Sequence, residues 1–236
     1  MVYRTTFELE KGEKMGELGN ENYVSRFLRY KCAGDIMNVV SPMHKPQKEI
    51  SESFSILRKI KPLTLVEKMK YNVLDLCAGN ALTSIMSVFI LPVTYALALD
   101  KKRKVRDYSM IKRFNYLEED IYSDFVKRYL DSPDSFLKES EMNTIIIASH
   151  PCKHAVRIIE LFNNSKAKAL CIIPCCNGSF DSLQGAGFLT SKMSKYDVWT
   201  YYLSSLVKDS KVSVTTDHNI WSPKNNVIWA VRDGNV

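Results

Sequence analysis

YNVLDLCAGNA, residues 71–81, is an apolar run that ends in a turn of small residues. The run through Leu76 has the length and composition of a buried strand, and the residues from Cys77 to Asn80 are typical of a tight turn. Glycine in such a turn lets the backbone come close to a ligand, because it has no side chain. The stretch therefore predicts a strand over 71–76, a turn suited to ligand contact, and a helix over 81–90.

The same alternation of short apolar runs and helical patterns continues along the chain. Further strands are predicted at 94–100, 113–117, 143–149, 167–174, 212–216 and 226–231. Helices are predicted at 48–60, 103–112, 121–130, 152–163 and 195–207, with short ones around Tyr23, Phe27 and Met37. Pro62 is expected beyond the end of the helix at 48–60. Strands that alternate with helices imply a mostly parallel sheet with helices on both faces. The last two strands, joined by a short loop, must be antiparallel to each other.

Length and composition indicate how the chain is organised. We expect an N-terminal part over 1–66, formed by a polar arm and the helices before the sheet, and a sheet domain over 67–236, in one compact unit. The 236 residues are 45% hydrophobic and 25% charged, which excludes a wholly disordered chain. The six cysteines are unevenly spaced and residues 1–14 are polar and charged. This pattern favours a reduced, intracellular protein over a secreted one.

One uncharged segment has a membrane span as its alternative interpretation. Residues 81–99 carry no charge and are followed by a basic cluster, which is the pattern of a span with a cytoplasmic flank. Pro92 divides the segment into an apolar run of helix length and a short apolar run. We therefore expect a buried helix followed by a buried strand, and no membrane partner.

Three acids follow three successive predicted strands. Asp75 lies at the end of the first, Asp100 ends the second, and Asp120 comes just after the third. Ligands of open α/β sheets bind at the carboxyl ends of the strands, where a carboxylate can accept hydrogen bonds from ribose hydroxyls or from an amino group. A dinucleotide site would instead need a Gly-x-Gly-x-x-Gly turn, and this turn has the single Gly79. A further alternative is that the acids cap helices or are merely exposed.

These residues resemble the cofactor motifs of class I S-adenosylmethionine-dependent methyltransferases, over roughly residues 45–232. The resemblance implies a Rossmann-like α/β fold and S-adenosyl-L-methionine as the cofactor. In that fold the first turn faces the methionine part, the acid after the second strand holds the ribose, and the acid after the third faces the adenine. The cofactor-binding residues expected from the resemblance are Asp75, Cys77, Ala78, Gly79, Asn80, Asp100, Lys101, Asp120, Ile121 and Ser149.

Imidazoles and thiols gather in the loops after the fourth and fifth predicted strands. His150, Cys152 and His154 follow the fourth strand, and Cys175 and Cys176 follow the fifth. Such groups could bind zinc, which prefers four nitrogen or sulfur ligands. The chain lacks a Cys-x-x-Cys pair, however, and we expect no metal. The cysteines could equally be small buried apolar residues, and His150 could be either a structural hydrogen-bond donor or a catalytic group.

The order His-x-Cys, helix, Pro-Cys-Cys resembles a methyltransferase subgroup that includes the eukaryotic tRNA acceptor-stem ribose methyltransferases and relatives of undefined substrate. Residues 43–49, MHKPQKE, resemble the basic stretch that begins the helix before the first strand in that subgroup. The Asn/Asp-Pro-Pro-Tyr motif of amino-group methyltransferases is absent after the fourth strand. The resemblance therefore favours transfer to a ribose hydroxyl or a protein side chain over transfer to a base amine.

A hydroxyl acceptor needs a base or a cation near its oxygen. The candidate catalytic residues are His150, Cys152, Cys176 and Lys45, with Lys48 as an alternative to Lys45. A covalent step at Cys175 or Cys176 is the competing mechanism, but the acid that it requires is not evident in the sequence.

Charge indicates the partner. The chain has a formal net charge of +7 at pH 7, and residues 101–106 form a basic run, KKRKVR. This run could contact RNA phosphates, form a solvated surface or act as a nuclear localisation cluster. Aromatic residues of the helix at 195–207 are more often core than base platforms. We expect RNA, either tRNA or rRNA, as the partner, with a protein substrate or a non-catalytic binding module as alternatives, and a cytoplasmic location with the nucleus as the alternative.

Overall fold

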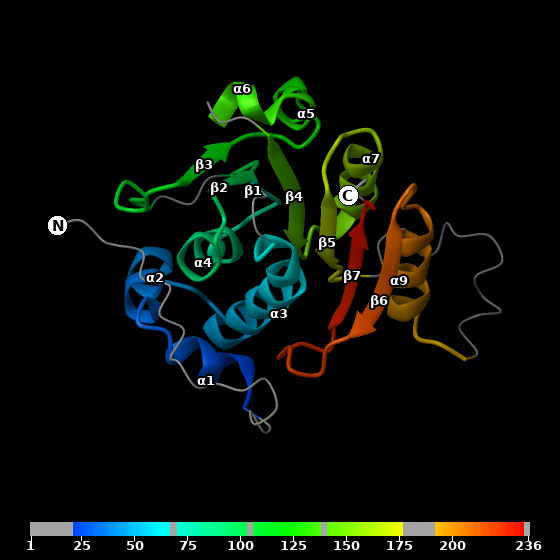
Figure 1. Ribbon diagram of the computed structural model, residues 1–236. Helices are drawn as coiled ribbons and strands as arrows, with labels where there is room; N and C mark the ends of the chain where they lie inside the picture. Colours follow the sequence, from blue (N-terminus) through cyan, green and yellow to red (C-terminus); the bar gives the residue numbers. More distant parts are fainter. Residues whose placement is uncertain (1–20, 67–69, 103–105, 138–140, 177–191, 234–236) are drawn as a thin grey trace.

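Seven strands form the central sheet in the part of the chain that the computed structural model describes, residues 21–66, 70–102, 106–137, 141–176 and 192–233 (Figure 1). The strands lie in the order β3-β2-β1-β4-β5-β7-β6. Their bounds are β1 Lys70–Leu76, β2 Tyr95–Asp100, β3 Phe114–Glu118, β4 Met142–Ser149, β5 Ala169–Ile173, β6 Lys211–Thr216 and β7 Asn226–Val231. The predicted seven-stranded sheet is confirmed. The predicted polar arm (1–19) and the loop at 177–187 lie outside the described residues.

Strand pairing fixes where the carboxyl ends of the strands meet. β1 pairs in parallel with both β2 and β4, β2 with β3, and β4 with β5. β7 is antiparallel to β5 and to β6, which confirms the predicted terminal pair. The chain adds β2 and β3 on one side of β1, and then adds β4 and β5 on the other side. The strand order therefore reverses between β1 and β4, and open sheets bind ligands at such a place.

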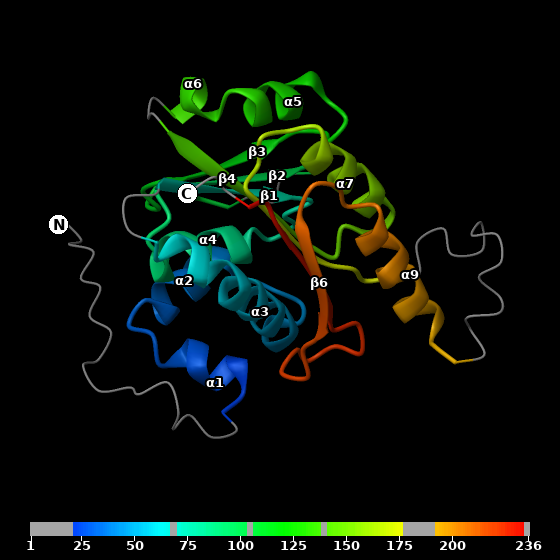
Figure 2. The same cartoon turned by 45° about the vertical axis from the view of Figure 1, so that its right-hand side comes forward.

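Helices cover both faces of the sheet (Figure 2). One face packs against the N-terminal helices and the helix after β1: α1 Tyr23–Leu28, α2 Ala33–Val40, α3 Pro46–Thr64 and α4 Leu82–Ile90. The other face packs against α5 Asp124–Asp131, α7 Ala155–Asn163 and α9 Lys195–Ser205. The short α6 Pro133–Leu137 lies beside α5, and a 3-10 turn at Cys152–His154 precedes α7. The helices of the N-terminal part thus share one hydrophobic core with the sheet.

The uncharged segment 81–99 forms a buried helix and a buried strand, as predicted. α4 occupies its first half and β2 its second. Within the described residues, the structure contains no helix long and apolar enough to cross a membrane.

The helix predicted over 103–112 is wrong for the residues that are described, because 106–112 form turns. The Arg106 side chain donates to the Pro42 carbonyl at 2.8 Å, and the Tyr108 ring stacks on Tyr116 with centroids 5.4 Å apart. Residues two apart on a helix point to nearly opposite sides. Arg106 and Tyr108 could not both reach these partners from a helix.

Pro62 lies inside α3, not beyond its end, so the predicted helix boundary is also wrong. Proline lacks the backbone N–H that would bond to the carbonyl four residues earlier. The last turn continues past this missing bond because the Leu65 N–H donates to the Lys61 carbonyl at 3.1 Å and the Thr64 hydroxyl donates to the same carbonyl at 3.0 Å. One missing hydrogen bond near a helix terminus is tolerated.

Arg232, just after β7, caps the carboxyl end of α7. Its guanidinium donates to the carbonyls of Phe162 at 2.7 Å and Ala167 at 3.0 Å, and also to that of Ser165. A cation at this place interacts favourably with a carbonyl of the last helical turn and with carbonyls of the loop that follows.

We expect Arg232→Ala to lower the free energy of unfolding by about 2 kcal/mol, because hydrogen bonds from a charged donor to half-buried carbonyls are lost. Urea unfolding measures this difference. Lys166→Ala is the matched control, since it removes an exposed cation from the loop between α7 and β5. Equal losses in the two variants would contradict the capping role.

Candidate functional site

The turn after β1 has a strained backbone. Cys77, Gly79 and Ala81 all have positive φ, at 62°, 54° and 57°. Non-glycine residues in this region cost about 1–3 kcal/mol each and gather at functional sites. A side-chain carbon added at Gly79 would meet no atom within 4 Å, so the space above this glycine is open to a ligand.

Asp100 holds this turn from the end of β2. Its Oδ2 accepts from the Gly79 N–H at 2.9 Å, and its Oδ1 accepts from the Lys102 N–H at 3.1 Å. The Gly79 carbonyl accepts from the Tyr116 hydroxyl at 2.9 Å. Each carboxylate oxygen can accept more than one hydrogen bond, so Asp100 keeps capacity for a ligand hydroxyl beside the open side of Gly79.

Asp120 follows β3 and is paired with Lys101. The Lys101 Nζ lies 3.1 Å from Asp120 Oδ2, and the Tyr122 N–H donates to Oδ1 at 3.1 Å. The Tyr122 N–H and then Lys101 lower the pKa of Asp120. Lys101, expected to bind the cofactor, thus contacts a second expected cofactor residue at the same edge. Ile121, next in the chain, is buried at 4% exposure.

Asp75 is buried and faces α4. Its Oδ2 accepts from the Ser84 hydroxyl at 2.5 Å, and the side chain is 2% exposed. Burial raises the pKa of Asp75 to about 7. The carboxyl group therefore links β1 to the start of α4 in the interior of the protein.

Asn80 links the turn to α3. Its Nδ2 donates to Glu49 Oε2 at 2.7 Å, and its Oδ1 accepts from Arg106 at 2.9 Å. Ala78 contributes its backbone, with its N–H donating to the Leu99 carbonyl at 3.0 Å. The turn is thus bonded to β2, to α3 and to the segment after β2.

His150 follows β4 and also contacts α3. Its backbone has a φ of 57° and its N–H donates to the Ile173 carbonyl at 2.9 Å. Its Nε2 lies 2.5 Å from Glu52 Oε1 and 3.0 Å from Lys48 Nζ, and Lys48 Nζ lies 2.7 Å from the same Glu52 oxygen. Glu52 is 2% exposed. The arrangement is a buried carboxylate with an imidazole and an ammonium group on one oxygen.

The thiols lie in the loops beside His150. The sulfurs of Cys152 and Cys175 are 3.1 Å apart, with Cys152 exposed and Cys176 half-buried. Burial, and then Cys152, raise the pKa of Cys175 to about 12, which disfavours the thiolate that a covalent step needs. Ser149 ends β4 at the same edge.

Metal ligands do not come together among the described side chains. No group of three or more His, Cys, Asp or Glu residues in that part of the chain could hold a metal ion. His154 instead packs against the Tyr122 ring, with centroids 5.8 Å apart.

The structure does not bring Lys45 to the cluster at His150. Lys45 is the exposed residue before α3, whereas Lys48, one turn further, makes the contact. Sequence reasoning missed Glu52 altogether. The only signal along the chain was the i+4 spacing of Lys48 and Glu52, because Glu52 falls opposite Ile50 and Phe54 on the predicted helix.

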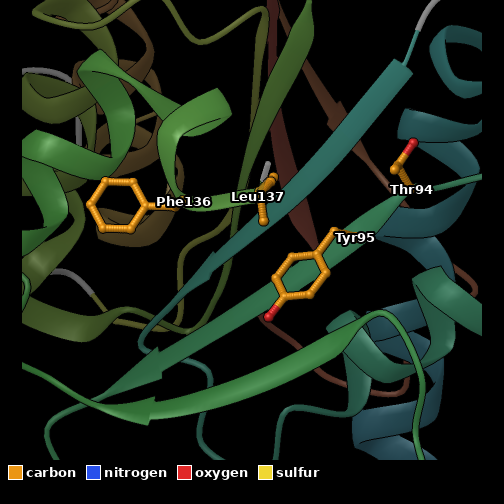
Figure 3. Close-up of a pocket in the computed structure, with 4 residues that line it drawn as sticks. All are labelled: Thr94, Tyr95, Phe136 and Leu137. Atoms are coloured by element: carbon orange, nitrogen blue, oxygen red, sulfur yellow. The ribbon is translucent and has the colours of Figure 1, made fainter. Parts of the chain in front are cut away.

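A small pocket lies elsewhere on the molecule (Figure 3). It is lined by Thr94, Tyr95, Phe136 and Leu137, at the start of β2 beside α6. Because the residues described above follow the carboxyl ends of the strands, this pocket is at the opposite edge of the sheet from them.

Comparisons with known proteins give one family and several distant structures. A family model described as a methyltransferase domain matches residues 45–183, more than half of the chain. None of the curated proteins compared with the chain matches it. The O-methyltransferase from Bacillus cereus, solved in complex with SAH, is 9% identical with a TM-score of 0.47, covering 92% of this chain and 94% of that one.

Two further solved structures are similarly distant. A chain of the fibrillarin/Nop5p complex is 15% identical with a TM-score of 0.44, covering 69% of this chain and 72% of that one. The plantazolicin methyltransferase BpumL, in complex with SAH, is 12% identical with a TM-score of 0.44, covering 90% of this chain and 95% of that one. At these values none of the similarities identifies a substrate for this chain.

The buried Asp75 gives a pH-dependent prediction for stability. Its pKa of about 7 in the folded protein lies above the ordinary value of 3.8. The folded protein therefore retains a proton that the unfolded chain releases, and the stability linked to this group is lost as the pH rises from about 4 to about 7. Asp75→Asn keeps an acceptor for Ser84 and does not titrate.

We expect the free energy of unfolding of Asp75→Asn, relative to the unsubstituted protein, to increase between pH 5 and pH 8. Urea unfolding at both pH values measures it, and Asp131→Asn is the control for loss of a carboxylate at an exposed position. A relative stability that is constant with pH would show that Asp75 titrates alike in the folded and unfolded states.

Proposed function

This chain belongs to the family of methyltransferase domains, and from that premise we propose that it methylates a hydroxyl group of RNA, with a ribose hydroxyl favoured. S-adenosylmethionine supplies the methyl group. The observation that carries the proposal is the cluster of His150, Lys48 and Glu52 beside the cofactor edge, because a neutral acceptor such as a hydroxyl must lose a proton during transfer.

The residues of the chain fit the cofactor. The open space above Gly79 suits a close approach of ligand to backbone, and Asp100 has remaining acceptor capacity for ribose hydroxyls. Asp120 stands at the end of the neighbouring strand. The methyl group comes from a sulfonium, which carries its own leaving group, so the protein mainly has to align the acceptor and exclude water.

His150 is the residue placed to accept the acceptor's proton. In the tautomer with its hydrogen on Nε2, the ring nitrogen 2.5 Å from Glu52 Oε1, the free lone pair is on Nδ1. Nδ1 is shielded from solvent and has no hydrogen-bond partner among the described residues. The side chain as a whole is 18% exposed, so an acceptor that reaches Nδ1 must displace the atoms that shield it.

Charge favours RNA as the acceptor. The net charge of +7 favours an anionic partner, and the exposed Lys45, before α3, is available for phosphate contact. Of the basic run 101–106, residues 103–105 lie outside the described residues, Lys101 is paired with Asp120, and Arg106 with Asn80. We propose a tRNA or rRNA substrate, in the cytoplasm or alternatively in the nucleus.

A protein hydroxyl is the second candidate, because the cluster of His150, Lys48 and Glu52 would serve a hydroxyl of RNA or of protein alike.

Asp100→Ala should weaken binding of S-adenosylmethionine by about 10–100-fold. The substitution removes an acceptor worth about 1–3 kcal/mol and releases the Gly79 N–H that it holds. Isothermal titration calorimetry measures the affinity. Asp107→Ala is the control, because Asp107 is exposed and bonds to Ser109 instead. Equal affinity in the Asp100 variant and the unsubstituted protein would refute the ribose assignment.

Labelled S-adenosylmethionine, given with total RNA and total protein, should transfer its methyl group into RNA. His150→Gln should lower turnover by about 10²–10⁴-fold, as expected for loss of a general base, with cofactor affinity nearly unchanged. Nuclease digestion and separation of the labelled nucleosides identify the methylated atom.

Other outcomes would replace the proposal. Label in protein alone would favour the second candidate, and unchanged turnover in His150→Gln would leave His150 a structural role. Cofactor binding with no transfer into either fraction would favour a non-catalytic binding module.

A further inference from the structure

We propose that Lys48 and Glu52 form a charge-balancing pair that keeps His150 a neutral imidazole until the acceptor's proton arrives. The role of that proton rests on the proposed function, whereas the electrostatic relation among the three side chains stands on the geometry alone. Lys48 and Glu52 are thereby positioning residues, which act through His150.

The geometry gives Glu52 two possible cations. Its Oε1 lies 2.7 Å from Lys48 Nζ and 2.5 Å from His150 Nε2, and the carboxyl group is 2% exposed. A buried carboxylate that lacks a counter-charge is strongly unfavourable. One positive charge is enough to balance it, and a lysine is charged far above the pH at which imidazole loses its proton. Lys48 therefore balances Glu52 and leaves the imidazole free to be neutral.

The short distance between Lys48 and His150 also bears on the charge of the imidazole. Lys48 Nζ is 3.0 Å from His150 Nε2. An ammonium group at this distance disfavours a second positive charge on the imidazole, while the carboxylate favours it. The two effects oppose each other at the imidazole, so removing either side chain leaves the effect of the other unopposed.

The other titratable groups near His150 are thiols, or belong to the loop between β6 and β7. In the three residues that follow β4 and the three that follow β5, the other titratable side chains are the thiols Cys152, Cys175 and Cys176. The loop between β6 and β7, which also packs on α3, carries Asp217, His218 and Lys224. Asp217 accepts from Tyr23 and Ser55, and Lys224 lies over the Tyr196 ring. Within the described part of the chain, the charged side chains in contact with the imidazole are Lys48 and Glu52.

The proton balance of the reaction follows. The acceptor oxygen bonds to the methyl carbon and loses its proton to His150 Nδ1, and the sulfur keeps the electron pair of the bond that breaks. The cluster of three side chains begins with no net charge and ends with one positive charge. A base that was already an imidazolium could not accept this proton.

The test is an NMR titration of the His150 imidazole in the full-length protein and two variants. The chain has four histidines, and the signal that disappears in His150→Gln is that of His150. In Glu52→Gln the remaining ammonium should move the midpoint of the His150 titration to lower pH. In Lys48→Met the remaining carboxylate should move it to higher pH.

Three further variants separate charge from folding. Lys48→Arg keeps the charge and should leave the midpoint nearly in place. The double variant Lys48→Met/Glu52→Gln removes both charges and should return the midpoint towards that of the unsubstituted protein, whereas damage to the fold would not cancel. Lys61→Met removes a cation from the exposed side of α3, 13 residues from Lys48 and so about 20 Å away, and should have no effect.

Two opposite displacements that cancel in the double variant support the proposal. Displacements of the same sign, or no displacement in the folded variants, overturn it whether or not the protein methylates RNA. The pH profile of methyl transfer is the separate test of the proposed function. If the titration midpoints of His150 move and the pH profile does not, the charge balance holds and His150 is not the base.

Discussion

Hydrogen bonding between one buried helix and the loops at the carboxyl edge of the sheet is the constraint on which the site depends. Three polar side chains of α3 that are buried or half-buried contact three different loops. Glu49 bonds to the turn after β1, Glu52 contacts the loop after β4, and Ser55 bonds to the loop between β6 and β7. These loops are far apart in the chain. They meet because one helix satisfies their polar groups.

The position of α3 is itself set by apolar packing. Ile50, Phe54, Leu57 and Ile60 are buried in the core that α3 shares with α1, α4 and the sheet. α3 is buried on more than this side, since Ser51, Glu52 and Ser55 are also removed from water, and these polar residues must find partners in the protein. Stability and site geometry are thus coupled, because the packing that holds α3 on the sheet also brings Glu52 to His150.

The fold, and the three acids at one edge of the sheet, could be predicted because their causes are local. Apolar runs of strand length, helical spacing, and acids at the ends of successive runs are all readable along the chain, and Asp75, Asp100 and Asp120 lie at the predicted strand ends. Errors arose where a distant contact overrode the local pattern. Arg106 bonds to Pro42 and Asn80 in place of a helix, and Lys48, not Lys45, reaches His150.

The sequence by itself thus determined the class of fold and the placement of Asp100 and His150 after the carboxyl ends of parallel strands. Only the tertiary structure decided which side chains meet there. Lys48 and Glu52 are about a hundred residues from His150 in the chain, and no periodicity relates the two segments. Their contact depends on how α3 crosses the ends of the parallel strands, which follows from burial of its apolar stripe and is a property of the whole packed core.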